Sequence, residues 1–261
     1  MTSESSIVAG GFVRSRNLFG GPGRISALIA LALLTLLRMF DPLPVDELRL
    51  RVYDLEQRLV PRTYQPVGVR IVAIDEDSLA KVGQWPWPRT KIAELVQRIA
   101  QGKPSVLGID VVFSEPDRFS PDALANEIPD ITEQMKRELE SMPSNETVLA
   151  EALANVPAVL ALSVGEHAPR AHRFPVRLTI VRESGRDPRP FLLSYPAPLG
   201  SLPEIAQAAR GRGTDIGEPD PDGVVRRIPL LVLADGNLLP ALSLEALRVA
   251  SGAGSIGIQT R

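Results

Sequence analysis

Two apolar runs that each end in an aspartate, with a helix-forming stretch between them, constrain the fold of this chain most strongly. Residues 69–74 lead directly into Asp75, and residues 106–109 lead into Asp110. A continuous apolar run rich in β-branched residues is typical of a strand covered on both faces. Two such strands joined by a helix form a βαβ unit, in which both strands end at the same edge of a sheet. The sequence therefore predicts an α/β domain with acidic side chains gathered at one sheet edge.

Helix and strand signals continue to alternate beyond this unit. The fold class that they predict is α/β, with a mostly parallel mixed sheet that is flanked by helices and preceded by one transmembrane helix. The expected elements are a helix capped by Thr90 and ending at Gly102, helices opened by Asp130, Ser144 and Ser201, a buried strand over 158–164, a surface hairpin around 184–188, a strand over 224–233 before the turn Asp235-Gly236-Asn237, and a closing helix over 239–250.

Composition excludes several classes of function. The formal net charge is -2, from 29 Lys+Arg and 31 Asp+Glu, so the chain lacks the positive field that a nucleic-acid partner requires. Cysteine is absent, which rules out disulfides, thiolate catalysis and cysteine-ligated metals. The two histidines, His167 and His172, lie in a polar stretch that is typical of a loop. No phosphate-binding loop, nucleophile elbow or metal-type histidine pair occurs, so an enzyme would have to depend on carboxylates alone. We expect no cofactor, no metal and no enzymatic activity for this chain, and the full-length protein is left open.

An apolar segment near the N-terminus predicts a membrane anchor. Residues 25–37 are apolar except for Ser26 and Thr35, with Arg24 before them and Arg38 after them. The run is shorter than the roughly 20 residues of a usual span, but flanking arginines can extend their charges to the two interfaces. A cleaved signal peptide and a buried soluble helix are the alternatives, although no small-residue cleavage site follows.

Charge next to this segment predicts the orientation of the chain. Three arginines precede the apolar run, with only Glu4 opposing them, which places the N-terminus in the cytoplasm and the rest outside it. We expect a disordered cytoplasmic leader over 1–23, an anchor in the cytoplasmic membrane over 24–40, a juxtamembrane helix and linker over 41–68, and an extracytoplasmic α/β domain over 69–261.

The juxtamembrane region carries an apolar stripe at helical spacing. Its members recur at intervals of three and four, and they are Val45, Leu48, Val52, Leu55 and Leu59. Valine and leucine at these alternating positions suit a parallel two-stranded seam, which favours a homodimer. The alternative is an amphipathic helix that packs on the core of its own domain.

The polar residues after the first two strands form the candidate site. Asp75, Asp77, Asp110 and Glu115 are expected to converge, together with an aromatic loop that contributes Trp85, Trp87 and Arg89. Four carboxylates at strand ends have the oxygen ligands for a hard cation. Asp75 and Asp77 after a strand also resemble the first motif of haloacid-dehalogenase-type phosphatases, which makes a carboxylate-dependent hydrolase one alternative. A further alternative is that the acids cap turns or pair with Arg89 without contacting a ligand.

Four motifs in a fixed order resemble the second class of CHASE domains, the sensory extracellular modules associated with cyclases and histidine kinases. The motifs are Val72-Ala-Ile-Asp75 with Ser78-Leu79, Gly83-x-Trp85-Pro-Trp87-Pro-Arg89, Gly108-Ile-Asp110-Val-Val-Phe113-Ser-Glu-Pro116, and Asp220-x-Asp222-Gly223-x-Val225-Arg226-Arg227-x-Pro229.

The resemblance implies an extracytoplasmic sensor in a bacterial membrane receptor, with a nucleotide cyclase or a kinase as its cytoplasmic output. The ligand or other stimulus is unknown, and an envelope interaction protein without a ligand is the remaining alternative. Family members usually continue past the position of Arg261, so the resemblance also implies that the sensor domain is incomplete at its C-terminus. A helical segment over 122–142 is additional to the family pattern.

Overall fold

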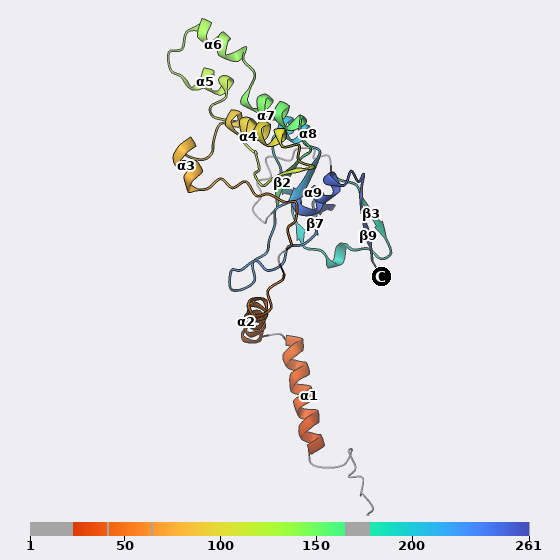
Figure 1. Ribbon diagram of the computed structural model, residues 1–261. Coiled ribbons are helices and arrows are strands. Elements are labelled where there is room, and N and C mark those ends of the chain that lie inside the picture. The colour runs from red at the N-terminus through yellow and green to blue at the C-terminus, as the bar shows by residue number, and fades with distance from the viewer. Residues whose placement is uncertain (1–22, 41, 64, 165–177, 261) are drawn as a thin grey trace, which may run out of the picture. The chain divides into compact units, whose positions relative to one another are not determined.

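The computed structural model of the protein describes residues 23–40, 42–63, 65–164 and 178–260 (Figure 1). The chain divides into two compact units, Met1–Val69 and Arg70–Arg261. The stretch that contains His167 and His172 lies outside the described residues.

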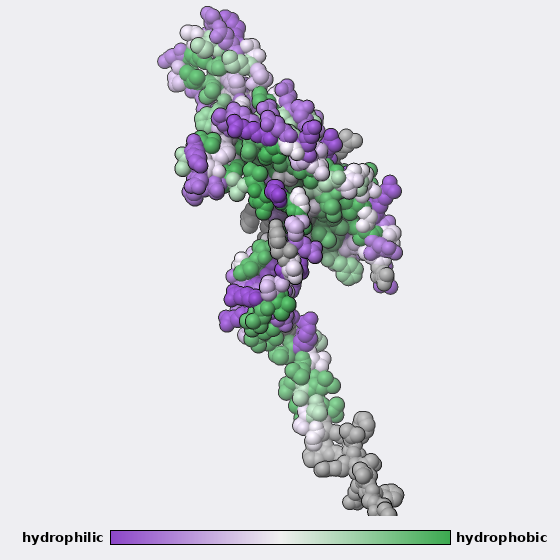
Figure 2. Space-filling view, viewed as in Figure 1, coloured by the Kyte–Doolittle hydropathy of each residue, from purple (hydrophilic) through white to green (hydrophobic). Residues whose placement is uncertain are grey.

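The first unit contains two helices, α1 (Gly23–Phe40) and α2 (Leu43–Leu59). All described side chains of α1 from Ile25 onward are exposed, and hydrophobic groups cover most of its surface (Figure 2). Within the described ranges, no single helix combines the length and apolar character that a membrane crossing needs, although Ile25–Phe40 and Leu43–Leu59, bent by 86°, meet both criteria as a pair. The expected single spanning helix is therefore not confirmed.

The second unit is built around a short sheet whose central strand is β2 (Ala158–Val164). β2 has the predicted bounds, because an uninterrupted Ala, Val and Leu run suits a strand buried on both faces. It pairs in parallel with β1 (Leu107–Ile109) on one side and with β6 (Gly211–Thr214) on the other. The end of β2 also pairs in antiparallel fashion with β5 (Pro198–Leu199).

Helices cover both faces of this sheet. On one face lie α4 (Arg89–Gln101), α7 (Asn145–Ala154) and α8 (Pro203–Ala208), which Figure 1 shows gathered beside β2. Their apolar side chains form the main core with Ala158 and Leu160 of β2. On the other face lies α9 (Leu242–Ala250), which approaches β6 so closely that a Cβ at Gly213 would lie 2.6 Å from the Cα of Leu242. Glycine at this position is what lets the helix and strand meet.

The described residues form two further small sheets, so the single mostly parallel sheet that was expected is not confirmed. The first contains β4 (Ser194–Tyr195), β7 (Leu231–Ala234) and β8 (Asn237–Pro240), and β7 and β8 form a hairpin at the predicted turn of Asp235 and Gly236, after which a helix had been expected. Both turn residues have positive φ, 50° and 76°, as a two-residue hairpin turn requires. The expected strand over 224–233 is thus shorter than predicted, and β8 occupies the start of the expected closing helix.

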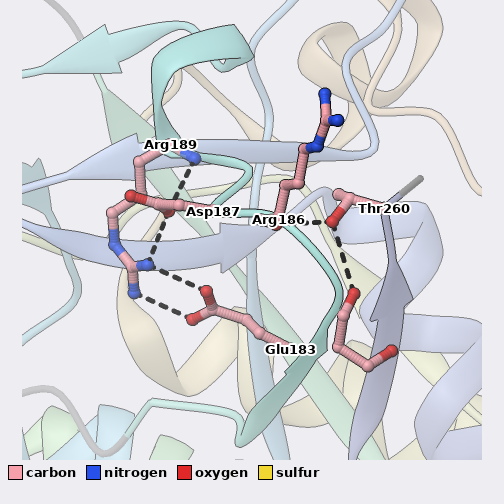
Figure 3. A network of polar contacts seen from close by, with 6 residues as sticks. Glu183, Arg186, Asp187, Arg189 and Thr260 are labelled. Atoms are coloured by element: carbon pink, nitrogen blue, oxygen red, sulfur yellow. Dashed lines mark hydrogen bonds and ion pairs between the residues drawn. The ribbon is translucent and has the colours of Figure 1, made fainter.

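The third sheet pairs β3 (Val181–Ser184) with β9 (Ile256–Gln259) in parallel, which corrects the hairpin expected around 184–188. After β3 the chain turns into a short 3-10 helix, η2 (Arg189–Phe191). Figure 3 shows why it does not return as a strand: Arg189 makes two hydrogen bonds of 2.8 Å to Glu183 and one of 2.9 Å to Asp187, which closes the turn on itself. The Thr260 hydroxyl donates to the carbonyl of Arg186 and so holds this turn against β9.

The first predicted strand is wrong. Residues 69–74 are not in a strand, and Ile71 is 89% exposed. A β-branched run forms a strand only where a neighbouring strand supplies hydrogen-bonding groups, and β1 pairs with β2 instead. The segment leads into α3 (Glu76–Val82), which ends at Gly83 with a φ of 112°.

Helix starts were predicted with mixed success. Ser144 caps α7 as expected, since its hydroxyl accepts from the backbone N–H of Thr147 at 3.1 Å. The expected cap Asp130 is wrong: α6 (Glu133–Glu140) is capped by Thr132, while Asp130 has a φ of 57° in the turn before it. The helix α5 (Pro121–Glu127) precedes this turn.

Two other predicted caps act differently. Thr90 lies inside the first turn of α4, because Pro88 is the residue that precedes the helix. Ser201 does not cap α8, and its hydroxyl instead accepts from the backbone N–H of Phe113 at 3.1 Å.

Candidate functional site

Two aspartates lie at the carboxyl ends of the parallel strands on either side of β2. Asp110 follows β1, and Asp215 follows β6. Partial burial raises the pKa of Asp215, and the nearby charge of Asp110 raises it further. The two side chains are therefore close enough to repel each other, although both remain accessible to solvent. Open α/β sheets bind ligands at this edge, so the pair is the candidate functional site.

The other predicted acids are placed differently. Asp75 is the N-cap of α3, where its carboxylate accepts from the hydroxyl of Ser78 at 2.6 Å and from the backbone N–H of Ser78 at 2.9 Å. These hydrogen bonds lower the pKa of Asp75 from its usual 3.8. Asp77 lies in the first turn of the same helix and is exposed. No group of three or more acids or histidines in the described part of the chain could hold a metal ion, so the four expected carboxylates do not form one cation site.

The aromatic loop serves the core. Trp87 is buried, and its indole N–H donates to the carbonyl of Gly83 at 2.7 Å. Trp85 is half-buried and packs edge-on against Trp87 with a ring-centroid distance of 5.8 Å. Trp85-Pro86 is a cis peptide bond. Trp87 thus belongs to the main core, and Trp85 packs against that core.

Arg89 packs against the loop that follows β1. Its guanidinium lies 4.8 Å from the ring centre of Phe113, and Nη2 donates to the carbonyl of Glu115 at 3.2 Å. Only the backbone of Glu115 takes part, and its side chain is exposed. Arg89 and Glu115 are therefore brought together, but through a main-chain contact and not through an ion pair.

A buried acid that was not among the predicted site residues organises this loop. Asp117 is 5% exposed, and its Oδ2 accepts from the backbone N–H of Arg89 at 2.6 Å and from the amide of Asn145 at 2.8 Å. Glu146 accepts in turn from the backbone N–H of Asp117 at 2.6 Å. Asp117 therefore caps α4 from another part of the chain, and the network ties the starts of α4 and α7 to the loop after β1.

The second acidic turn is closed by an arginine. Arg226 contacts Asp220 at 2.9 Å and Asp222 at 2.6 Å. Hydrogen bonds from Arg226 lower the pKa of Asp222 to about 2. Gly223, with a φ of 81°, turns the chain between these residues. The turn is thus stabilised by its own ion pairs.

Sequence reasoning missed Asp215 and Asp117 for different reasons. Asp215 follows the strand Gly211-Arg-Gly-Thr214, in which two glycines hide any strand pattern. Its only signal was an aspartate in the loop after α8. Asp117 directly follows the motif that ends at Pro116, and nothing in the sequence pattern distinguishes a buried acid from an exposed one.

Comparison with known proteins identifies the family. The model of the CHASE2 domain matches residues 27–260, which is most of the chain. No curated protein and no solved structure matches this chain. The match agrees with the four motifs, two of which form the loop after β1 and the indole-bearing loop before α4. This chain belongs to the CHASE2 family of extracellular sensory domains, which occur in signalling receptors and are not catalytic.

Proposed function

We propose that this chain is the signal-input part of a bacterial transmembrane receptor that controls a cytoplasmic adenylate or guanylate cyclase or a kinase. The observation that carries the proposal is the CHASE2 match over residues 27–260, which extends from the apolar helix α1 through the α/β unit. In this proposal α1 anchors the protein in the cytoplasmic membrane, and the second unit lies outside the cytoplasm. The exposed apolar surface of α1 and the arginines before it support this orientation.

The stimulus acts, in this proposal, at the edge formed by Asp110 and Asp215. Repulsion between two neighbouring carboxylates makes one arrangement of the loops costly, and a bound cationic group or a proton relieves it. A ligand that binds one arrangement better than another shifts the population toward that arrangement. Asp75 and Asp77 on α3, together with Trp85, Trp87, Arg89 and Glu115, would act mainly by positioning the loops that lead to this edge.

The signal passes to the membrane, in this proposal, through a homodimer of α2. The side chains of Leu48, Val52, Leu55 and Leu59 are all exposed, which leaves the predicted apolar stripe without cover. Two copies anchored in the same membrane have their α2 helices parallel, as the valine and leucine pattern of the stripe requires.

Single-cysteine labelling tests the orientation, because the chain contains no cysteine of its own. Glu151 is exposed on α7, and Ser5 precedes α1. In intact cells with a permeabilised outer envelope, a membrane-impermeant maleimide should label Glu151→Cys and leave Ser5→Cys unlabelled until the inner membrane is opened. Labelling of Ser5→Cys first, or of both variants only after lysis, would overturn the proposed topology.

Cross-linking and output measurements test the other two parts. Leu55→Cys on the stripe should form a disulfide-linked dimer in membranes, whereas Gln57→Cys, two residues away on another face of α2, should not. In the full receptor, Asp110→Asn and Asp215→Asn should change the basal output and the stimulated output, while Asp235→Asn in the exposed hairpin turn should leave both unchanged. If all three variants gave the same basal and stimulated output, the proposal that the stimulus acts at the strand-end edge would be wrong.

A further inference from the structure

The loop between β6 and β7 exposes its apolar side chains and folds a charge inward. Its large apolar members are between 47% and 61% exposed, and they are Val224, Val225, Ile228 and Leu230. By contrast, the side chain of Arg226 is only 6% exposed. Charged side chains of soluble proteins usually lie in water, and a cluster of exposed apolar side chains often marks an interaction site. Residues 220–230 therefore form an apolar loop with the surface of a contact site.

The apolar loop is held in shape by its own contacts. The backbone N–H of Asp220 donates to the carbonyl of Val224 at 3.0 Å, and that of Gly223 donates to the carbonyl of Asp220 at 2.8 Å. Arg226 lies between Asp220 and Asp222 and pairs with both. The apolar side chains are thus presented by a closed turn. A surface that is already ordered loses little conformational entropy when it binds.

The charges of the apolar loop are complementary to a second copy of the same loop. Asp220, Asp222 and Arg226 together carry a charge of about -1, and Asp222 is 39% exposed. The next residue, Arg227, is exposed and makes no ion pair or hydrogen bond with any residue in the described ranges. Across a twofold axis each surface meets its own copy, so the cation of one loop can face the acidic turn of the other, and the reverse.

Charge and size favour a second copy over a lipid surface. The two aspartates and two arginines of residues 220–230 sum to zero, so the loop has no net positive charge to attract anionic lipid head groups. The loop is smaller than the roughly 20–30 residues a side of a stable interface. It therefore suits a contact between copies that are already held together, where the effective concentration is high.

We propose that the apolar loops of two copies pack against each other in the receptor dimer. Val224, Val225 and Ile228 form the apolar centre of this contact, and Arg227 of each copy pairs with Asp222 of the other at its rim. The inference rests on the proposed homodimer of α2 for its high effective concentration. It goes beyond that proposal because it places a second dimer contact in the α/β unit itself.

Cysteine cross-linking of the full chain in membranes tests the proposal, because the chain contains no cysteine of its own. Val224→Cys, Val225→Cys and Ile228→Cys are made separately and treated with a short bismaleimide. At least one of them should give a covalent dimer in high yield. Leu247→Cys, on α9 and 64% exposed, is the matched control and should give no more than a tenth of that yield.

A charge reversal tests the rim of the contact. Arg227→Glu, added to the loop variant that cross-links best, should lower the dimer yield at least fivefold because it opposes Asp222 with a like charge. Arg98→Glu, the same change on the exposed face of α4, should leave the yield within twofold. Arg227→Lys keeps the charge and should retain at least half of the yield. Far-ultraviolet circular dichroism checks that each variant is folded.

Four results would overturn the proposal. They are no dimer from any of the three loop variants, a Leu247→Cys yield equal to theirs, equal losses in Arg227→Glu and Arg98→Glu, and quenching of a fluorophore on the loop cysteine by nitroxide-labelled lipids, which would place the loop in the bilayer. Leu55→Cys on α2 separates the two proposals. If it cross-links while the loop variants do not, the homodimer of α2 stands and only the loop contact is wrong.

Discussion

The carboxylate of Asp117 accepts the backbone N–H of Arg89 across 28 positions of sequence, at a distance of 2.6 Å. Helix α4 has no side-chain cap of its own, because Pro88 occupies the capping position. The cap therefore depends on tertiary structure, and it forms only when the loop after β1 has docked. This contact connects two family motifs, the loop that carries both indoles and the segment that begins at Gly108.

Asp117→Ala should destabilise the protein by about 2–4 kcal/mol, because it leaves buried donors without an acceptor. The donors are the backbone N–H of Arg89 and the amide of Asn145. Urea denaturation followed by circular dichroism measures the change. Asp122→Ala, an exposed acid five residues along the chain, should cost no more than about 0.5 kcal/mol. Equal losses in the two variants would contradict the assigned role of Asp117.

Trp87→Ala should cost about 3–5 kcal/mol, as expected for a large aromatic side chain in a packed core. Trp87 is 7% exposed and contributes an indole hydrogen bond to Gly83, whereas Trp85 is only half-buried. Trp85→Ala should therefore lower the free energy of unfolding by clearly less than Trp87→Ala. The midpoints of urea denaturation decide the order, and a larger loss for Trp85→Ala would show that this ring, and not Trp87, is the anchor of the loop.

Asp215→Asn should stabilise the protein slightly at pH 7, on the order of 0.5 kcal/mol after solvent screening. Burial and Asp110 raise the pKa of Asp215, so the folded state binds this proton more tightly than the unfolded state. The stability that protonation provides is complete below the ordinary pKa of 3.8 and is lost as the pH rises through the folded pKa. The difference between variant and wild type should thus shrink at pH 3, as thermal melts at both pH values can measure.

The control for this prediction is Asp235→Asn, which removes the same charge from the hairpin turn. Asparagine tolerates the positive φ of 50° at this position, so the turn should persist. The stability difference between Asp235→Asn and the wild type should not shrink between pH 7 and pH 3. A stabilisation of Asp215→Asn that is equal at pH 3 and pH 7 would contradict repulsion between Asp110 and Asp215.

Tyr195 should titrate near pH 12 in the folded protein. Burial is the main cause of its raised pKa, and a hydrogen bond of 2.7 Å to Glu218 adds to it. The stability associated with the neutral phenol is present below the ordinary pKa of 10.0 and is lost as the pH rises through about 12. Ultraviolet absorbance of tyrosinate measures the titration. Glu218→Gln should lower the pKa of Tyr195 only in part, and a return to 10 would show that the charge of Glu218, not burial, is the larger cause.

Elements whose apolar pattern matched their burial could be predicted from the sequence. β2 has its predicted bounds because all of its side chains except that of Ser163 are buried. α7 begins where Ser144 and Thr147 indicated, since a local hydroxyl cap depends on few neighbours. The turn at Asp235 and Gly236 was also predicted, because it needs residues that tolerate positive φ, but the strand β8 that follows it was not, since a helix was expected there.

Elements that depend on distant partners could not be predicted. Residues 69–74 have a strand composition but are not in a strand, whereas β6 has two glycines and becomes a strand because it pairs with β2, and its glycines leave room for α9. The same dependence on distant partners limited the prediction of the candidate site. Asp110 could be predicted because it ends a recognisable strand, and Asp215 could not because its strand was hidden.

The parallel pairing of β3 with β9 has a consequence for the order of folding. The Thr260 hydroxyl and the carbonyl of Ser184 are joined across 76 positions of sequence, and each strand has only four residues. Contacts of such long range carry a large loop-closure cost, and a four-residue ladder returns little until the intervening elements are compact. This sheet should therefore assemble after the core around β2, and its amides should be among the first to exchange with deuterated solvent.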